Sequence, residues 1–156
     1  ARALIPEVSR LPGIDGQTKM SKSLNNAINL NDTADEISKK VKKMYTDPNH
    51  IRIEDPGKVE GNPVFIYLDV FGSDFKKIEE LKAHYKRGGL GDSVVKKYLL
   101  EVLLNFLEPI QKRRAEFNKS EDEIIDILKK GTEAANEIAT KTLDEVRSVM
   151  GIHYFI

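Results

Sequence analysis

The chain has 156 residues, a formal net charge of zero, and 40% hydrophobic and 32% charged residues, a composition that is typical of globular domains and excludes an intrinsically disordered chain. It contains no cysteine, which excludes a disulfide framework, a thiolate zinc site and a cysteine nucleophile. Because the charges balance, an anionic partner must be bound by local basic clusters. No apolar run approaches ~20 residues and no signal-peptide pattern opens the sequence, so we expect a cytoplasmic protein with no membrane association.

The first 31 residues differ in character from the remainder of the chain. Leu4–Val8 fits the end of a short strand, whereas Pro12, Gly13 and Gly16 mark a loop that cannot be helical throughout. The polar stretch that follows extends to Asn26. We expect this segment to be a mobile, glycine-hinged loop. Because the sequence opens at an alanine, we interpret the chain as a piece of a longer protein.

From residue 32 onward the sequence predicts a mostly α fold, a helical bundle of five or six helices. Thr33–Glu36 and Ser120–Glu123 have the sequence of capping boxes, and Asn62 and Asp74 are expected N-cap residues. The short apolar run 64–68 leaves a strand as an alternative, but the proline after Asn62 favours a helix. The helices are expected at residues 33–46, 63–71, 76–87, 92–110, 120–131 and 135–150.

Residues 92–110 carry an apolar face that is wide enough for the central core helix. We expect Pro109 to kink this helix or to begin a new turn, and Gly131 to break or bend the helix that follows. The apolar stripe between residues 135 and 150 is expected to pack in the bundle. The aromatic side chains at helical spacing are predicted to pack in the core, and not to form a base-stacking platform; they are Phe65, Tyr67, Phe71, Tyr98 and Phe106.

The pentapeptide Lys19–Ser23, with the sequence KMSKS, is the most informative segment of the chain. A chance match in a chain of this length is on the order of one in ten thousand from average residue frequencies. Lys19 and Lys22 can place two ammonium groups on one oligophosphate, and the short hydroxyl side chains beside them add donors. Gly13 and Gly16 would allow the loop to close over such a ligand. A basic, serine-rich surface loop is the alternative.

Together with its Gly13–Gly16 approach and Asn25–Asn26, the pentapeptide resembles the second signature of the class I aminoacyl-tRNA synthetases. Four further stretches are similar to bacterial tryptophanyl-tRNA synthetases, and the resemblance covers essentially the whole chain. They are Met44–Pro48, Gly61–Phe71, His84–Asp92 and Leu107–Arg114.

The resemblance implies that residues 1–31 are the end of a Rossmann-like catalytic domain with its signature loop, and that residues 32–156 form a helical anticodon-binding domain. Enzymes of this family make tryptophanyl-adenylate from L-tryptophan and ATP with Mg²⁺, transfer it to tRNA(Trp), and work as homodimers without a tightly bound cofactor. The other signature of the class, a His-x-Gly-His element, and the tryptophan pocket are missing. We therefore expect a C-terminal fragment that is monomeric and inactive alone.

The same resemblance implies roles for individual residues. Lys19 and Lys22 are the candidate catalytic residues, because they would neutralise the triphosphate as its α-phosphorus is attacked. The serines would add hydrogen bonds, the methionine would line the nucleotide side, and a leucine would pack near adenine. The candidate ATP-binding residues are Leu11, Lys19, Met20, Ser21, Lys22 and Ser23.

Basic clusters are the candidates for tRNA contact, since phosphate neutralisation requires them. The densest is Lys112, Arg113 and Arg114; others are 39–43, 86–87 and 129–130. Most of these lysines have acidic residues nearby and are expected to be solvated helix faces. His50 is expected in a turn or at the surface, and no metal-ligand spacing occurs in the sequence. A tyrosyl-tRNA synthetase fragment and a non-catalytic helical RNA- or protein-binding module remain the alternative functions.

Overall fold

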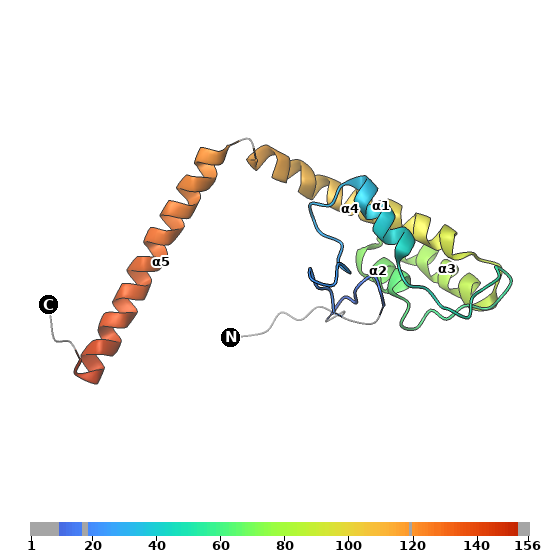
Figure 1. Ribbon diagram of the computed structural model, residues 1–156, viewed down its shortest axis with the longest axis horizontal. Coiled ribbons are helices and arrows are strands. Elements are labelled where there is room, and N and C mark those ends of the chain that lie inside the picture. Colours follow the sequence, from blue (N-terminus) through green and yellow to red (C-terminus); the bar gives the residue numbers. More distant parts are fainter. Residues whose placement is uncertain (1–9, 17–18, 119, 153–156) are drawn as a thin grey trace. The chain divides into compact units, whose positions relative to one another are not determined.

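The computed structural model describes residues 10–16, 19–118 and 120–152, and these form five helices without a strand. The helices are α1 (Ala34–Lys43), α2 (Pro63–Phe71), α3 (Phe75–Arg87), α4 (Asp92–Phe117) and α5 (Glu121–Met150) (Figure 1). The predicted mostly α fold is therefore confirmed, and the strand alternative for residues 64–68 was wrong. The strand end expected at residues 4–8 lies outside the described residues.

The first three helices begin where the cap residues predict. At α1 the side chain of Thr33 accepts a hydrogen bond from the Glu36 amide at 3.3 Å, and Glu36 Oε2 accepts one from the Thr33 amide at 2.7 Å. Asn62 caps α2 through a 3.0 Å bond from the Val64 amide, and Asp74 accepts from the amide of Lys77 in α3. Each cap satisfies an amide that the first helical turn leaves without a partner.

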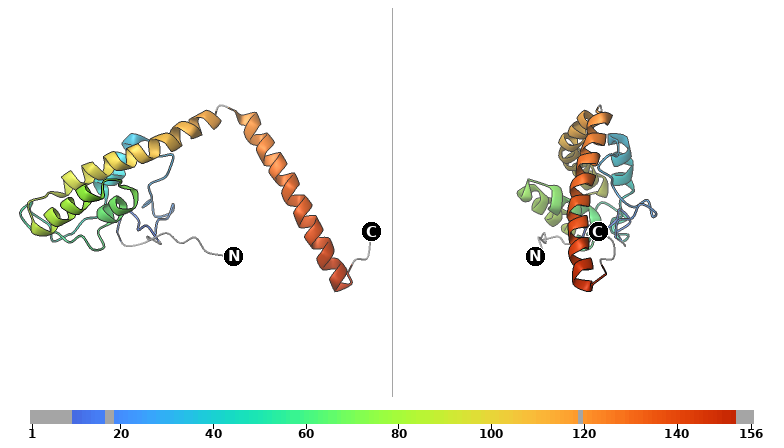
Figure 2. Two further views of the ribbon diagram at one scale, coloured as in Figure 1. Left: turned by 180° about the vertical axis from the view of Figure 1, so that it is seen from behind. Right: turned by 90° about the vertical axis from the view of Figure 1, so that its left-hand side faces the viewer.

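The core of residues 10–111 lies where α1, α2, α3 and α4 meet. Phe65 of α2 packs on Tyr85 of α3 with ring centroids 5.1 Å apart, and Lys96 Nζ of α4 donates to a carbonyl of α1. Figure 2 shows α1, α2 and α3 gathered beside the first part of α4. The buried apolar residues of these helices and of the segments between them are Ile37, Val41, Met44, Val64, Phe65, Tyr67, Leu68, Ile78, Tyr85, Leu90, Val95, Leu99, Leu103 and Leu107. Of the predicted core aromatics, Phe65 and Tyr67 are buried, Phe71 and Tyr98 are partly buried, and Phe106 is 43% exposed.

In the described chain, both helices continue through the residues at which a kink, a bend, a break or a new helical turn was expected. α4 continues through Pro109 to Phe117, so the proline removes one backbone hydrogen bond without ending the helix. α5 runs uninterrupted through Gly131, and nothing lies within 4 Å of the place where a Cβ would stand there. The helices predicted on either side of Gly131 are thus one helix of 30 residues.

α5 departs from the sequence-based expectation in one further respect. Ser120 precedes it, but its side chain makes no capping hydrogen bond within the described residues, so the second capping box was wrong. None of the residues of α5, all of which are described, is buried. The packing expected for its apolar stripe stays a prediction.

The chain divides into two compact units, Ala1–Gln111 and Lys112–Ile156. The expected domain boundary after residue 31 stays a prediction. None of the helices in the described ranges is long and apolar enough to cross a membrane.

Candidate functional site

The loop that carries the pentapeptide folds back on the glycine-rich segment before it. Pro12 and Lys19 form an isolated antiparallel bridge, and the Ile14 amide donates to the Asn26 carbonyl at 2.8 Å. In the segment between Pro12 and Lys19, the amide of Gly16 donates to the carbonyl of Gly13 at 2.9 Å and closes a turn. Gly16 has a φ of +71°, a conformation that L side chains rarely adopt. The two glycines therefore shape a turn that lies against the pentapeptide.

Two tyrosines attach this loop to the helical body. The hydroxyl of Tyr67 in α2 donates to the Pro12 carbonyl at 2.8 Å, and the Tyr45 amide after α1 donates to the Ile14 carbonyl at 2.7 Å. Burial raises the pKa of Tyr67 to about 12, with a smaller contribution from the charge of Asp15, so the hydroxyl keeps its proton near neutral pH. The loop thus approaches the helices through specific donors at two points.

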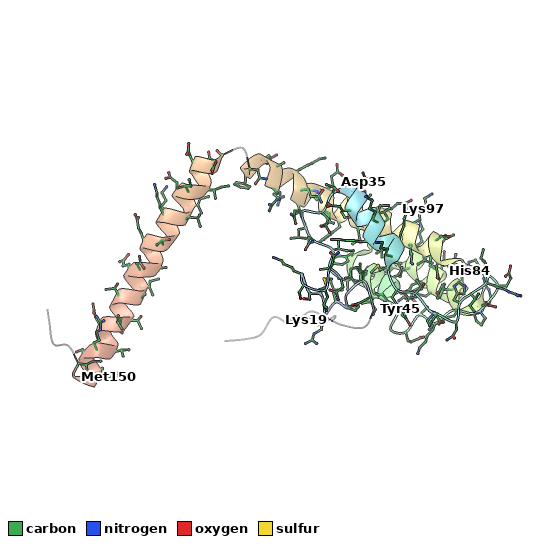
Figure 3. All side chains as sticks on the ribbon, viewed as in Figure 1. Lys19, Asp35, Tyr45, His84, Lys97 and Met150 are labelled. Carbon is green, nitrogen blue, oxygen red and sulfur yellow. The ribbon has the colours of Figure 1, made fainter. Side chains whose placement is uncertain are left out.

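The candidate ATP-binding residues occupy two kinds of position. Lys19, Lys22 and Ser23 are exposed, and Lys19 is visible on the loop in Figure 3. Ser21 is partly buried, and its Oγ lies 2.8 Å from Ser23 Oγ. The two lysines and two hydroxyls therefore come from one short, solvent-accessible segment, the arrangement that contact with an oligophosphate requires.

The two apolar candidates face inward. Leu11 and Met20 are partly buried and pack against the core cluster. Their roles near adenine and the nucleotide stay predictions. Ser21 and Lys22 line a polar cavity of about 270 Å³ together with three asparagines: Asn25, Asn29 and Asn31.

Asn26 organises the loop, and sequence reasoning assigned it no role. It is 3% exposed, and its Oδ1 accepts a 2.7 Å hydrogen bond from the Ser21 amide. Its Nδ2 donates to Asp15 Oδ2 at 2.9 Å. The sequence alone carries no signal for this role, because the burial of Asn26 and its contacts arise only in the folded loop.

A second polar centre lies at the start of α4, around the carboxylate of Asp92. Hydroxyl groups donate to it from Tyr85 and Thr46, each at 2.7 Å, and His50 Nδ1 lies 3.0 Å from Oδ1. Burial opposes the charge of Asp92, but these hydrogen bonds outweigh burial and lower the pKa of the carboxyl below 3.8. The Asp92 centre fixes the chain between α1 and α2 to the base of α4.

His50 belongs to this centre, and the prediction of a turn or surface position was half right. Its amide donates to the Asp47 carbonyl at 3.1 Å, which confirms the turn. Its side chain, however, is only 3% exposed and packs edge-on against Tyr85 at 4.6 Å. Nε2 of His50 is buried and has no hydrogen-bond partner among the described residues. The imidazole is a structural group of the helical body.

A groove between α1 and α4 carries three lysines. It has a volume of about 460 Å³, and its basic residues are Lys42, Lys96 and Lys97, beside Ser38, Ser93 and Asp92. Burial lowers the pKa of Lys96, an effect that the charge of Asp92 opposes. Of these lysines, the sequence indicated only Lys42, as part of the 39–43 cluster. The groove can bind an anionic group at its rim.

The remaining basic clusters differ in their partners. Lys40 pairs with Asp32 at 2.5 Å and Lys86 with Glu60 at 2.5 Å, so both are neutralised locally. Lys112, Arg113 and Arg114 are all exposed in the last turns of α4. Within the described ranges, no group of three or more His, Cys, Asp or Glu residues could hold a metal ion.

Comparison with known proteins adds a consistent family assignment. The family model described as tRNA synthetases class I (W and Y) matches residues 2–108. Over 156 residues the chain is 58% identical to a tryptophan–tRNA ligase of Clostridium longisporum, covering 99% of this chain and 46% of that protein. It is 58% identical over 148 residues to that of Streptococcus pneumoniae TIGR4, covering 94% of this chain and 43% of that protein.

The solved structures agree. A tryptophanyl-tRNA synthetase from Campylobacter jejuni, crystallised with ADP and tryptophan, matches with a TM-score of 0.76 and 28% sequence identity. The match covers 93% of this chain and 44% of that one. The chain therefore spans less than half the length of the relatives it matches.

Proposed function

The chain belongs to the class I tRNA synthetases of the tryptophan and tyrosine group, and from this membership we propose that it acts as the C-terminal part of a tryptophan–tRNA ligase. The whole enzyme would join L-tryptophan and ATP into tryptophanyl-adenylate with release of pyrophosphate, and then esterify tRNA(Trp). The observation that carries this proposal is the pentapeptide Lys19–Ser23, whose two lysines are both exposed on one attached loop. The 58% identity to tryptophan–tRNA ligases favours tryptophan over tyrosine.

In this proposal Lys19 and Lys22 neutralise charge that develops on the triphosphate as the tryptophan carboxylate attacks the α-phosphorus. Ser21 and Ser23 donate hydrogen bonds to phosphate oxygens. Donors aimed at a developing charge accelerate a reaction because they bind the transition state more tightly than the ground state. Lys22 is therefore expected to affect the rate of adenylate formation more than ground-state affinity for ATP.

The residues of the loop fit ATP better than they fit a protein-bound metal. The pentapeptide offers ammonium and hydroxyl donors, and Asp15, a carboxylate of the preceding turn, accepts a hydrogen bond from Asn26. Mg²⁺ would accordingly be held by the phosphate oxygens of ATP, where it would supply further charge neutralisation.

The helical body is the proposed contact surface for tRNA(Trp). Its candidates are the exposed cluster Lys112–Arg114 and the rim of the groove formed by Lys42, Lys96 and Lys97. Such contacts predict an affinity that falls as salt rises, because phosphate binding releases counterions. The whole enzyme is proposed to be a cytoplasmic homodimer. This chain alone is proposed to be a monomer, which light scattering would test.

A hybrid enzyme tests the proposal. This chain replaces the matching 46% of the Clostridium longisporum ligase, and tryptophan-dependent exchange between ATP and pyrophosphate is measured. We expect exchange, and a fall of about 100-fold or more in kcat for Lys22→Ala with the KM for tryptophan unchanged. Lys76→Ala, at an exposed lysine of α3, is the matched control and should retain the rate.

One outcome contradicts the proposal and identifies its alternative. The half taken from the Clostridium longisporum ligase chooses the amino acid in this hybrid, so exchange tests the role of the loop and not the choice between tryptophan and tyrosine. Absence of exchange with either amino acid, in a hybrid that folds, would leave a non-catalytic helical binding module.

A further inference from the structure

The side chain of Asn26 bridges two segments of the loop that are separated in sequence. Its Oδ1 accepts from the Ser21 amide at 2.7 Å, inside the pentapeptide, while its Nδ2 donates to Asp15 Oδ2 at 2.9 Å in the preceding turn. The same Nδ2 lies 3.4 Å from the Lys19 carbonyl. One amide therefore contacts both segments of the loop, and it needs an acceptor and a donor to do so.

The backbone around this amide is built to its shape. The carbonyl of Asn26 accepts from the Ile14 amide at 2.8 Å, so main chain and side chain bind the same turn. Gly13 packs directly on the amide: a Cβ at that position would lie 2.3 Å from Nδ2. Just before Asn26, Asn25 adopts a left-handed φ of 50°, which turns the chain out of the pentapeptide. The turn is thus packed against the Asn26 amide, with no room for a side chain at position 13.

Burial makes these contacts consequential. Asn26 is 3% exposed, so water cannot readily replace a bond that is lost. The Asp15 contact also explains the choice of asparagine over aspartate, because a second carboxylate at 2.9 Å would repel the first and could not donate.

We propose that Asn26 is a positioning residue, which sets the backbone of the pentapeptide so that its lysines and hydroxyls converge on a triphosphate. This inference rests on the function proposed above, and it adds a residue outside the pentapeptide to the phosphate site. The effect passes through Ser21 and Lys19, whose backbone groups the amide holds. A misplacement of about 1 Å in such a site is sufficient to lower a rate by on the order of 100-fold.

A double-substitution cycle tests the proposal. Asn26→Asp removes the amide donor and places a second carboxylate against that of Asp15. The exchanged pair, Asp15→Asn with Asn26→Asp, again has one donor and one acceptor at this contact. The exchanged pair also has the net charge of the unmodified chain. Asn105→Asp, at an exposed asparagine of α4, controls for the added charge alone.

The first measurement uses this chain by itself with inorganic tripolyphosphate as the probe. Amide chemical shifts of residues 19–23 are followed by ¹H–¹⁵N NMR as the probe is added. We expect Asn26→Asp to weaken binding by about 10-fold, Asn105→Asp to leave it unchanged, and the exchanged pair to recover at least half of the loss. The dispersed core resonances report whether the fold is retained.

The second measurement uses the hybrid enzyme described above. A positioning role predicts that Asn26→Asp lowers kcat for exchange by about 10-fold or more, leaves the KM for tryptophan unchanged, and is rescued in the exchanged pair. If Asn26 only stabilised the fold, Asn26→Asp would lower the thermal midpoint without lowering kcat at an unchanged KM for tryptophan.

The outcomes separate this inference from the proposed function. If the unmodified hybrid shows no exchange, the proposed function fails, and the tripolyphosphate titration alone decides the role of Asn26. If Asn26→Asp binds tripolyphosphate like the unmodified chain, or if the exchanged pair recovers nothing, the positioning role is refuted.

Discussion

The hydroxyl of Tyr85 offers a direct test of the Asp92 centre. Tyr85 is 1% exposed, and its hydroxyl donates to Asp92 Oδ1 at 2.7 Å, beside the bond from Thr46 and the contact of His50. Tyr85→Phe removes that one hydroxyl and keeps the ring, which packs on Phe65 at 5.1 Å. The substitution thus isolates a single hydrogen bond to a charged group.

The expected loss in the free energy of unfolding is about 2 kcal/mol, because a net hydrogen bond to a charged partner contributes roughly 1.5–3 kcal/mol. At about 4 °C per kcal/mol for a unit of this size, the midpoint should fall by roughly 8 °C. Near-ultraviolet circular dichroism of the tyrosines follows the transition. Tyr98→Phe is the control, since the Tyr98 hydroxyl makes no hydrogen bond within the described residues.

The pH dependence of the unfolding free energy gives a second test of the bond between Tyr85 and Asp92. The folded pKa of Asp92 lies below 3.8, so the charged carboxylate stabilises the fold above the unfolded pKa, and this stabilisation is lost as pH falls through the folded pKa. The difference in unfolding free energy between the unmodified chain and Tyr85→Phe should therefore have its full size at pH 7 and become smaller below about pH 3.8. A midpoint that shifts by less than about 2 °C at pH 7 would refute the reasoning.

Three other predictions concern backbone and caps. Gly13→Ala should displace the Asn26 amide and shift the amide resonance of Ser21 in NMR spectra, whereas unchanged loop shifts would contradict the 2.3 Å approach. Gly131→Ala should stabilise α5 by about 1 kcal/mol, seen as higher helicity in far-ultraviolet circular dichroism, because nothing obstructs a Cβ there and alanine has the higher helix propensity. Thr33→Ala should lower unfolding free energy by about 1 kcal/mol in urea titration, and Thr33→Ser should restore most of it.

The sequence predicted helix starts well because caps are local. Thr33, Asn62 and Asp74 each reach an amide two or three residues away, so sequence spacing determines whether the bond can form. Ser120 shows the boundary of that reasoning: its spacing suits a capping box, yet its backbone has a φ of −127° and a ψ of 68°, and the side chain does not reach the helix amides. Cap chemistry identified where α5 begins but not how it is capped.

Breaks inside helices were harder to predict, because propensity is a weak term that other terms outweigh. Pro109 lacks one donor, but α4 buries Leu103 and Leu107 just before it, and this burial keeps the helix in place. Gly131 has about 1 kcal/mol lower propensity than alanine, which a long helix with strong helix formers on both sides tolerates. The apolar stripe of α5 was a correct reading of periodicity, but periodicity cannot say what a face packs against.

The buried polar groups could not be predicted from local pattern at all. His50 and Asp92 are 42 positions apart, and their 3.0 Å contact exists only because the segment after α1 returns to the base of α4. Without that topology a histidine in a turn is correctly assigned to the surface. Its burial is a tertiary effect, and the signal in the sequence is limited to its polar neighbours.

The same division runs through the candidate site. KMSKS is identifiable because its chemistry depends on residues that are adjacent in sequence, and its lysines lie exposed as that chemistry requires. Asn26 acts from outside the motif, at three positions beyond its last residue, through contacts to Asp15 and Ser21 that only the folded loop creates. A motif therefore identifies the groups that would touch a ligand, whereas the residue that orients them becomes visible only when burial and hydrogen-bond partners are known. For this loop, the strongest argument that orientation matters is the glycine at position 13, since a side chain there would occupy the space of the Asn26 amide.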